Sequence, residues 1–410
     1  MIEPRLDLDY VRRQFPAFEE PALRDKAFFE NAGGSYVCRH VIWRLSRFYR
    51  EHKVQPNHGF DASRIAGQEM DDAHTRLAQM LGIQTSELSF GPSTTQNTYV
   101  LSQAFAEWLP EGAAIIVTDQ DHEANSGPWR RLAARGFELR EWQMDPETGH
   151  LSADGLRALL DDRVALVCFP HCSNILGEIN DVAHLTRIAH DAGALVCVDG
   201  VSYAPHGFPN VGALDADIYL FSAYKTFGPH QGIMCMRREL ALQLPNQGHV
   251  FNADRPEKRF TPAGPDHAQV AACAGLSDYY DALYDKHYRA GRDAKGRAAQ
   301  LHDLFRAHET RLMEPLLEYL RARNDVRLLG PDRAAHRAPT LSLVVQDNPQ
   351  DLVSRLNTHG IMAGAGHFYA SRCLRALGVD ASHGVLRLSF VHYTSEAEVD
   401  RLLEALDHVL

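Results

Sequence analysis

Between about residues 28 and 238, short apolar runs alternate with longer amphipathic stretches. The runs are rich in Val, Ile, Leu and Cys and lack strict polar alternation, as expected of strands buried on both faces. Such strands, separated by amphipathic helices, form a mostly parallel sheet that helices cover. The sequence therefore predicts an α/β fold with strands at 113–119, 163–170, 194–200, 217–223 and 232–238.

The stretches between these runs carry helix signals. Residues 151–161 and 181–193 place apolar side chains at three- and four-residue spacing. Ser152 and Asp181 are suited to cap the starts of these helices, and Gly193 is suited to end the second one. Both segments are predicted to be crossover helices of the sheet.

The pattern changes after about residue 245. A segment rich in Pro and Gly precedes a long helical run from about 266 to 323, and the remainder predicts the strands and helices of a small α+β unit. The chain is therefore expected to form a large domain over residues 25–265, and a small domain that combines residues 1–24 with residues 266–410.

Composition limits the partners of the chain. Its 410 residues are 45% hydrophobic, and 42 basic against 53 acidic side chains give a net charge of −11. A negative field repels nucleic acids and anionic membranes, and no uncharged run reaches the ~20 residues that a membrane span needs. We expect a cytoplasmic protein that binds neither nucleic acid nor membrane.

Seven cysteines are scattered along the chain, most of them in apolar strand-like segments, which is typical of reduced thiols in a core. Cys168 and Cys172 are closely spaced, but no second Cys/His pair follows at the spacing of a zinc site. No metal site is predicted.

One lysine is a candidate nucleophile. Lys225 follows the strand at 217–223 and lies among hydroxyl groups and aromatic rings. Burial lowers the pKa of a lysine, and its free amine can then form a Schiff base with a carbonyl group. A lysine at the sheet edge with its amine in water is an equally good interpretation of the local sequence. Asp199, at the end of the strand at 194–200, favours the chemical role, since a carboxylate there can hold a pyridine nitrogen protonated.

Two further segments are candidates for binding. Residues 91–97 precede an apolar helix, and backbone amides with hydroxyl groups at a helix start can bind an anion. His122 follows the strand at 113–119, where an imidazole can stack on a planar ligand or move protons. Taken singly, an ordinary helix cap and one of 22 histidines are the simpler interpretations.

The order of these segments resembles the class V aminotransferase family of pyridoxal-phosphate enzymes, in its cysteine-desulfurase-like branch, over nearly the whole chain. The matching motifs are ENAGGS at 30–35, STTQN at 93–97, DHEAN at 121–125, PHCSNILGEIN at 170–180, VDGVSYAPH at 198–206, FSAYKTFGP at 221–229 and LRLSFVHYTSEAEVDRL at 386–402. The resemblance implies fold type I, with a mostly parallel seven-stranded sheet in the large domain and a smaller α+β C-terminal domain. It also implies pyridoxal 5'-phosphate as the cofactor.

The resemblance implies three catalytic residues. Lys225 would form the Schiff base with the cofactor, and Asp199 would pair with the pyridinium nitrogen. His122 would stack on the ring and shuttle protons. The family acts on α-amino acids through an external aldimine and an α-carbanion, so the same chemistry is expected here.

The resemblance also implies the remaining cofactor contacts. The phosphate would be held by Thr94, Thr95, Ser222 and Tyr224. Tyr224 replaces a histidine found in many desulfurases, and its hydroxyl can still donate a hydrogen bond. Asn174 would lie near the ring hydroxyl, and Ser202 stands where desulfurases usually have a glutamine.

Substrate contacts and assembly follow from the same resemblance. Arg387 would bind the α-carboxylate of the substrate, and Asn31 would lie at the pocket wall with Tyr36, Phe368 and Tyr369. The family forms homodimers with active sites at the interface. A residue of the segment 261–267, with Thr261 as the obvious hydroxyl, would reach the phosphate of the neighbouring subunit.

One departure from the family pattern leaves the reaction open. Tyr369 stands where desulfurases carry their nucleophilic cysteine, and Cys373 lies nearby at the start of an expected helix, where a helix dipole could support a thiolate. A helix residue that faces the core is the simpler interpretation of Cys373. The leading hypothesis is an aminotransferase-type enzyme. A cysteine desulfurase or C–S lyase is the first alternative, and a non-catalytic protein that binds the cofactor or a partner is the second.

Overall fold

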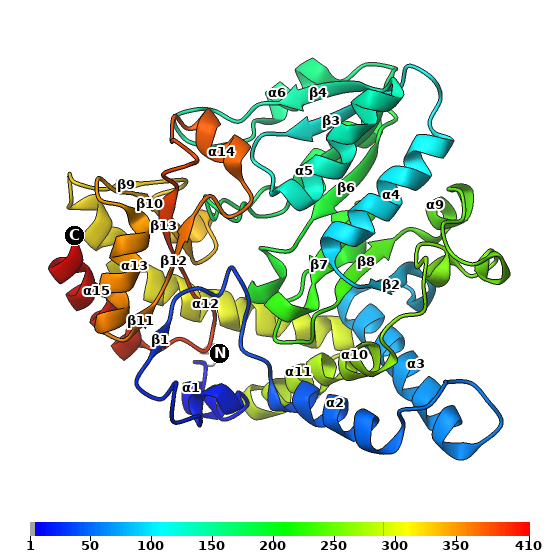
Figure 1. The fold of residues 1–410 in the computed structure, drawn as a ribbon, viewed down its shortest axis with the longest axis horizontal. Coiled ribbons are helices and arrows are strands. Elements are labelled where there is room, and N and C mark those ends of the chain that lie inside the picture. The colour runs from blue at the N-terminus through cyan, green and yellow to red at the C-terminus, as the bar shows by residue number, and fades with distance from the viewer. Residues whose placement is uncertain (1–4, 290) are drawn as a thin grey trace.

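A computed structural model of the chain describes residues 5–289 and 291–410. Its largest sheet has seven strands in the order β2-β8-β7-β6-β5-β3-β4 (Figure 1). Strand β8 is antiparallel to both of its neighbours, and the pairs from β7 to β4 are parallel. The strands span Leu88–Gly91 (β2), Ala114–Thr118 (β3), Glu138–Trp142 (β4), Val164–Pro170 (β5), Leu195–Asp199 (β6), Ile218–Ser222 (β7) and Gly232–Met236 (β8).

All five strands predicted from the apolar runs are present, and the mostly parallel sheet is confirmed. Strand β4 is absent from that prediction because it lies at the sheet edge, where only Trp142 of its five residues is buried. The other four side chains of an edge strand face solvent at least in part. They therefore have no apolar pattern for sequence reasoning to detect.

Helices bury both faces of this sheet. On one face Leu101, Phe105 and Trp129 pack on Ile115 and Leu166, and on the other face helices α3, α7, α10 and α11 contribute to the main core. The helices around the sheet are α2 (Arg39–Glu51), α3 (Asp61–Leu81), α4 (Thr94–Trp108), α5 (Glu123–Arg130), α6 (Ala153–Leu159), α7 (Val182–Asp191), α8 (Val211–Leu214) and α9 (Arg238–Gln243).

The predicted helix caps are confirmed. The Ser152 side chain accepts a hydrogen bond from the amide of Gly155, and the Asp181 side chain accepts one from His184. Gly193 adopts a φ of +82° just after α7, a conformation that favours glycine.

The long helical run expected between 266 and 323 is confirmed, and the structure divides it into three helices. These are α10 (His267–Ala272), α11 (Ala274–His287) and α12 (Ala294–Arg321). Helix α11 ends because Tyr288 adopts an extended backbone, with φ of −126° and ψ of 158°. Asp293 then caps the start of α12 by accepting a hydrogen bond from the amide of Gly296.

A second, antiparallel sheet has the order β12-β13-β10-β9 and packs with helices α13 and α15. Its strands are β9 (Arg327–Leu328), β10 (Thr340–Val344), β12 (Gly364–Gly366) and β13 (Val385–Ser389), and the helices are α13 (Pro349–Thr358), α14 (Ser371–Ala376) and α15 (Glu396–Val409). Strands β1 (Ala27–Phe28) and β11 (Ile361–Met362) form a short parallel pair beside it.

The N-terminal segment lies against the C-terminal part of the chain (Figure 1). Helix α1 (Leu8–Arg12) carries Arg12, which forms an ion pair of 2.6 Å with Glu398 in α15. Residues 1–4 of the expected 1–24 segment lie outside the described residues. Within the described part of the chain, no helix is long and apolar enough to cross a membrane.

Candidate active site

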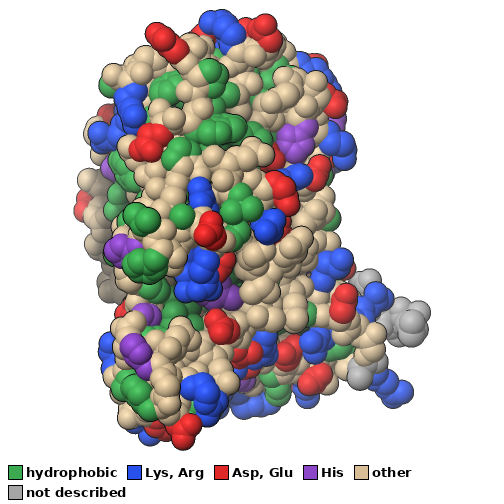
Figure 2. Space-filling view, turned by 90° about the vertical axis from the view of Figure 1, so that its right-hand side faces the viewer, with side chains coloured by type: hydrophobic (Ala, Val, Ile, Leu, Met, Phe, Trp, Pro, Cys, Tyr) green, Lys and Arg blue, Asp and Glu red, His purple; other side chains and the backbone are tan. Residues whose placement is uncertain are grey.

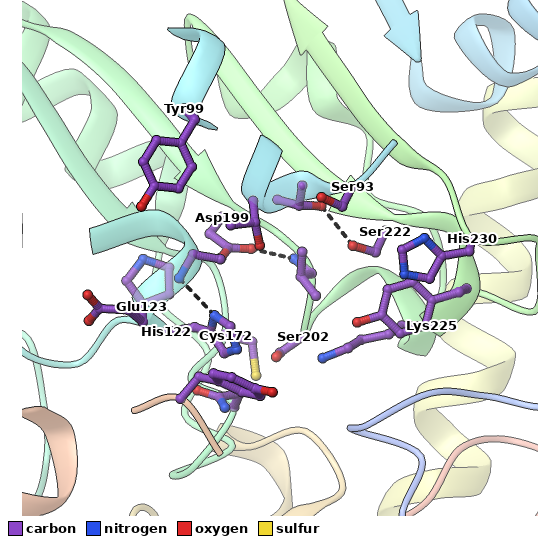
Figure 3. Close-up of a pocket in the computed structure, with 18 residues that line it drawn as sticks. Ser93, Tyr99, His122, Glu123, Cys172, Asp199, Ser202, Ser222, Lys225 and His230 are labelled. Carbon is purple, nitrogen blue, oxygen red and sulfur yellow. Dashed lines mark hydrogen bonds between the residues drawn. The ribbon is translucent and has the colours of Figure 1, made fainter. Parts of the chain in front are cut away.

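A cavity of about 470 Å³ opens at the carboxyl ends of the parallel strands (Figure 3). Loops that leave parallel strands converge at this edge, which is where open α/β sheets bind ligands. The cavity is lined by nine of the eleven residues expected at the site, namely Thr94, Thr95, His122, Asn174, Asp199, Ser202, Ser222, Tyr224 and Lys225.

Lys225 lies in the turn that follows β7, and its side chain extends towards Ser202 (Figure 3). It is buried, and this burial lowers its pKa to about 8, with a smaller contribution from the positive charge of Arg387. A larger fraction of the amine is therefore neutral and nucleophilic at neutral pH than for a lysine in water. The chemical interpretation of Lys225 is supported over that of a solvated surface lysine.

Asp199 ends strand β6 and faces the same cavity (Figure 3). Burial raises its pKa to about 6, while a hydrogen bond from the amide of Val201 and the charge of Lys225 lower it. The carboxylate is 5% exposed and has no ion-pair partner within 4 Å among the described residues. A bound cation, such as a protonated ring nitrogen, would supply the missing positive charge.

His122 begins helix α5 and forms one wall of the cavity. Its Nδ1 accepts a hydrogen bond of 3.0 Å from the amide of Ala124, so the proton of the neutral ring is on Nε2. Burial, together with the smaller effects of the positive charges of Lys225 and Arg387, lowers the pKa of His122 to about 3. The imidazole is therefore neutral at physiological pH, which suits stacking on a flat ring.

The start of helix α4 offers donors to an anion. Ser93 caps the N-terminus of this helix of 15 residues, and the Thr94 and Ser222 hydroxyl oxygens lie 2.7 Å apart at the same N-terminus. Gly232 allows the approach, because a Cβ atom there would lie 2.6 Å from the amide nitrogen of Thr94. Unpaired amides and the helix dipole together favour a phosphate at such a place.

A histidine that sequence reasoning missed lies at the same end of the cavity. His230 stacks on Tyr224 with ring centroids 4.9 Å apart and an angle of 9° between the planes. Its Nδ1 lies 3.2 Å from the carbonyl oxygen of Pro92, and its ring lines the cavity. The sequence did contain a signal for this residue. Tyr224 replaces the histidine found in many desulfurases, and His230 follows six residues later in the same loop.

Asn174 has one buried polar atom without a partner. Its side-chain nitrogen donates to the carbonyl of Phe368 at 2.9 Å, whereas Oδ1 is buried and accepts no hydrogen bond. A buried acceptor without a donor is costly, so a ligand hydroxyl would improve its environment. Ser202 lines the same cavity and a second, much smaller one that Asn31 and Lys225 also line.

Two expected substrate contacts do not line the main cavity. Arg387, on β13, is 2% exposed, and its guanidinium is paired with Glu30 and covered by the ring of Phe368. The side-chain nitrogen of Asn31 donates to the carbonyl groups of Phe28 and Ser389, and its oxygen accepts from Tyr393. Both donors of the Asn31 amide are therefore used within the chain.

Cys373 faces the core, which is the simpler of its two interpretations from the sequence, and a thiolate there is not supported. Cys373 is the third residue of the six-residue helix α14, is fully buried and packs in the main core. Burial raises the pKa of its thiol, which is the opposite of the dipole-assisted lowering that the sequence allowed. Tyr369, by contrast, is 68% exposed, and its ring centroid lies 5.3 Å from that of His122.

All seven cysteines are free and buried, as the apolar context of most of them indicated. Cys172 lines the main cavity, but burial raises the pKa of its thiol to about 12. Among the described residues, no group of three or more His, Cys, Asp and Glu side chains is placed to hold a metal ion.

The segment 261–267 lies beside the site rather than in it. The Thr261 hydroxyl donates to the carbonyl of Phe90 at 3.2 Å. The segment lines a neighbouring cavity of about 440 Å³, which shares His230 with the main one.

The chain has clear relatives. The family model for class-V aminotransferases matches residues 27–256 and 298–402. The chain belongs to the class-V aminotransferase family. An aminotransferase-like protein, FGM3 of Gibberella zeae, is 32% identical to this class-V chain, and the alignment covers 100% of both proteins. A cysteine desulfurase of Cronobacter sakazakii is 30% identical, with 97% of each protein covered.

Solved structures agree with this assignment. The apo structure of a cysteine desulfurase from Thermococcus onnurineus matches the class-V chain with a TM-score of 0.84 and 25% identity, covering 100% of this chain and 99% of that one. The resemblance to the desulfurase-like branch and the expected fold are confirmed. The family consists of pyridoxal-phosphate enzymes, and this chain is an enzyme, so the alternative of a non-catalytic protein is not supported.

Proposed function

We propose that this class-V enzyme binds pyridoxal 5'-phosphate and transfers the amino group of an α-amino acid. One observation carries the proposal: Lys225 and Asp199, from the ends of neighbouring strands, face one cavity. Burial shifts both pKa values against the charged forms: it lowers that of Lys225, which favours a neutral amine, and it raises that of Asp199, whose carboxylate would therefore gain from a cationic partner. Burying these two charged groups is unfavourable for folding. Groups with shifted pKa values of this kind are concentrated at functional sites.

The cavity suits this cofactor in size and in hydrogen bonding. Its volume of about 470 Å³ is in the range of small-molecule sites, which is roughly 300 to 1,000 Å³. The start of α4, with Thr94, Thr95, Ser222 and His230, would hold the phosphate. The unpaired Oδ1 of Asn174 would accept from the ring hydroxyl. When bound, the cofactor supplies an aldehyde that condenses with amines and a ring that withdraws electrons.

Four residues of the chain would then have separate roles in the reaction. Nζ of Lys225 would hold the cofactor through its aldehyde carbon, and the free amine of Lys225 would take the proton from the α carbon of the substrate. The carboxylate of Asp199 would keep the ring nitrogen protonated, and the neutral imidazole of His122 would hold the ring in place from one side. Arg387 would receive the carboxylate of the substrate.

The cysteines support amino-group transfer over desulfuration. A desulfurase needs a thiolate that can reach the substrate sulfur. Among the described residues that line the main cavity, Cys172 is the one cysteine, and burial raises the pKa of its thiol to about 12, so it is not a thiolate at neutral pH. Tyr369 occupies the position at which the family pattern expects that thiol. Transfer of the amino group needs no thiol, so it is the reaction that these residues favour.

The proposal is tested by titrating the purified, cofactor-loaded protein with a panel of amino acids that includes cysteine. We expect the visible absorbance of the cofactor to be lost, with one keto acid formed per site and no sulfide. Absorbance that returns while sulfide accumulates would instead establish a desulfurase or lyase. A protein that gains no visible absorbance with pyridoxal phosphate would contradict the proposal altogether.

Replacing Cys373 by alanine is expected to leave turnover unchanged within about two-fold. Its side chain is buried in the core, so the main effect is a loss of roughly 1 kcal/mol in the free energy of unfolding. Turnover and denaturant unfolding measure the two effects. Loss of turnover in a variant that remains folded would show that Cys373 takes part in the reaction, and would favour the desulfurase alternative.

We further propose that the enzyme is cytoplasmic and that it has a large domain over 25–265 and a small domain formed by the rest of the chain. We also propose that it is a homodimer with its active sites at the subunit interface. The segment between β8 and α10 exposes Val250 and Phe251, which are 88% and 81% exposed. The side of the molecule shown in Figure 2 mixes hydrophobic, histidine and charged side chains of both signs. A second subunit packed against the segment between β8 and α10 would cover Val250 and Phe251 and place 261–267 near its partner's phosphate site. Sedimentation at micromolar concentration tests this assembly.

A further inference from the structure

The guanidinium of Arg387 is already occupied by groups of the chain itself. Its Nη2 donates to Oε1 of Glu30 at 2.5 Å, and its Nη1 donates to the carbonyl oxygen of Asn174 at 3.2 Å. The ring of Phe368 lies 3.6 Å from the central carbon and covers one face. A substrate carboxylate that approaches from the main cavity therefore meets a cation that has been neutralised.

The Glu30 side chain sits in a space that two glycines keep open. A Cβ atom at Gly33 would lie 1.9 Å from Oε2 of Glu30, and one at Gly364 would lie 2.9 Å from Oε1. These glycines come from the loop after β1 and from strand β12, far apart in the sequence. Gly33, Gly364 and Arg387 therefore form a small site, here called the seat, that the Glu30 carboxylate occupies.

The Glu30 side chain can also leave the seat, because it is partly exposed to solvent. The side chain of Glu30 is 26% exposed, whereas that of Arg387 is 3% exposed. Rotation of Glu30 into water would leave the buried guanidinium without a counter-charge, which is strongly unfavourable unless another carboxylate takes its place. The arrangement therefore has two satisfied states, one with Glu30 and one with a carboxylate ligand.

We propose that Glu30 determines substrate specificity by acting as an internal ligand of Arg387. With Glu30 in place, the site accepts primary amines that carry no carboxylate beside the amino group. An α-amino acid binds only by displacing Glu30 from Arg387. This inference rests on the proposed function, because it concerns which amines reach the cofactor held by Lys225.

The test compares Glu30→Gln with the wild-type enzyme, both loaded with pyridoxal phosphate, using L-norleucine and its decarboxylated counterpart, pentylamine. Dissociation constants are measured from the absorbance change on binding and by calorimetry. We expect the substitution to tighten norleucine binding by about ten-fold or more, since one charged competitor is removed, and to leave pentylamine binding within about two-fold. An unchanged or weaker affinity for norleucine would overturn the inference.

A second variant keeps the test decisive if Gln disturbs the fold. In Glu30→Ala, added acetate should fill the vacated seat and compete with norleucine but not with pentylamine. Acetate should have no such effect on the wild-type enzyme, and the absence of competition in the variant would contradict the inference. Glu396→Gln is the matched control: this exposed carboxylate pairs with Arg5 at 2.8 Å and does not line the cavity, so its loss should leave both affinities within about two-fold.

The outcomes for the two proposals are distinguishable. A wild-type protein that gains no visible absorbance with pyridoxal phosphate would overturn the proposed function, and this inference with it. A protein that gains the absorbance, but whose preference between norleucine and pentylamine is the same with and without Glu30, would overturn the inference alone.

Discussion

Replacing Lys225 by methionine should abolish the visible absorbance that covalent attachment of pyridoxal phosphate produces, and should lower turnover by about 10² to 10⁴-fold or more. Methionine keeps an unbranched side chain but has no amine to attack the aldehyde or to take the substrate proton. Absorbance spectroscopy and steady-state kinetics on the purified variant measure both effects. A variant that retains the absorbance and the turnover would refute the assignment of Lys225.

The same substitution should stabilise the cofactor-free protein. A lysine whose pKa falls from 10.5 to about 8 on folding destabilises the folded state by about 3 kcal/mol below pH 8. The variant should therefore gain up to about 3 kcal/mol in the free energy of unfolding at pH 7, and this gain should disappear as the pH rises from 8 to 10.5. Lys286→Met, at a surface ion pair with Asp7, is the matched control and should retain the absorbance and the turnover.

Replacing Asp199 by asparagine should lower turnover by roughly 10² to 10⁴-fold, because an amide cannot hold the ring nitrogen protonated. Asparagine has the same shape and can still accept the hydrogen bond from Val201. Covalent attachment to Lys225 should persist, so the visible absorbance should remain while turnover is lost. Turnover close to that of the wild-type enzyme would show that this carboxylate does not serve the ring.

The stability of the cofactor-free Asp199→Asn protein should also rise, with a pH dependence of its own. Burial raises the pKa of the carboxyl from 3.8 to about 6, so the charged form destabilises the folded state. The gain should be absent below pH 3.8, grow between pH 3.8 and 6, and reach about 3 kcal/mol above pH 6. Asp217→Asn is the control: this buried carboxylate pairs with His190 at 2.9 Å, so its loss should lower stability.

These paired effects describe a site that is maintained at the expense of stability. A lysine and an aspartate that are both buried without a close ion pair are unfavourable in the protein alone. A bound cofactor would compensate both, through a covalent bond at Lys225 and a positive ring nitrogen at Asp199. Cofactor binding should therefore stabilise the wild-type enzyme more than either variant.

Much of the site could be predicted from the sequence because each of its residues lies at the end of a strand or the start of a helix. The apolar runs locate the strands, and parallel strands bring their carboxyl ends to one edge. This reasoning places Asp199, Lys225, His122 and the start of α4 at that edge as candidates. The roles of Asn174, Ser202 and Tyr224 came only from the resemblance to a family.

Other features could not be predicted because they depend on segments that are far apart in the sequence. The sequence left Cys373 open between a core residue and a reactive thiol, and only the packing of α14 against the core decided for the first. His230 gained a role only once its ring was seen against Tyr224. Local patterns carry no information on which distant side chain will cover a given group.

The sequence by itself determined the order of strands and helices, the caps of the crossover helices and the family, because these depend on the spacing of apolar residues and on contiguous motifs. Only the tertiary structure decided which charged side chains are free to bind a ligand. Arg387 fits the pattern of a carboxylate-binding arginine, yet Glu30 neutralises it in a seat kept open by Gly33 and Gly364. The state of a charge depends on its neighbours within a few ångströms, and in this protein those neighbours come from opposite ends of the chain.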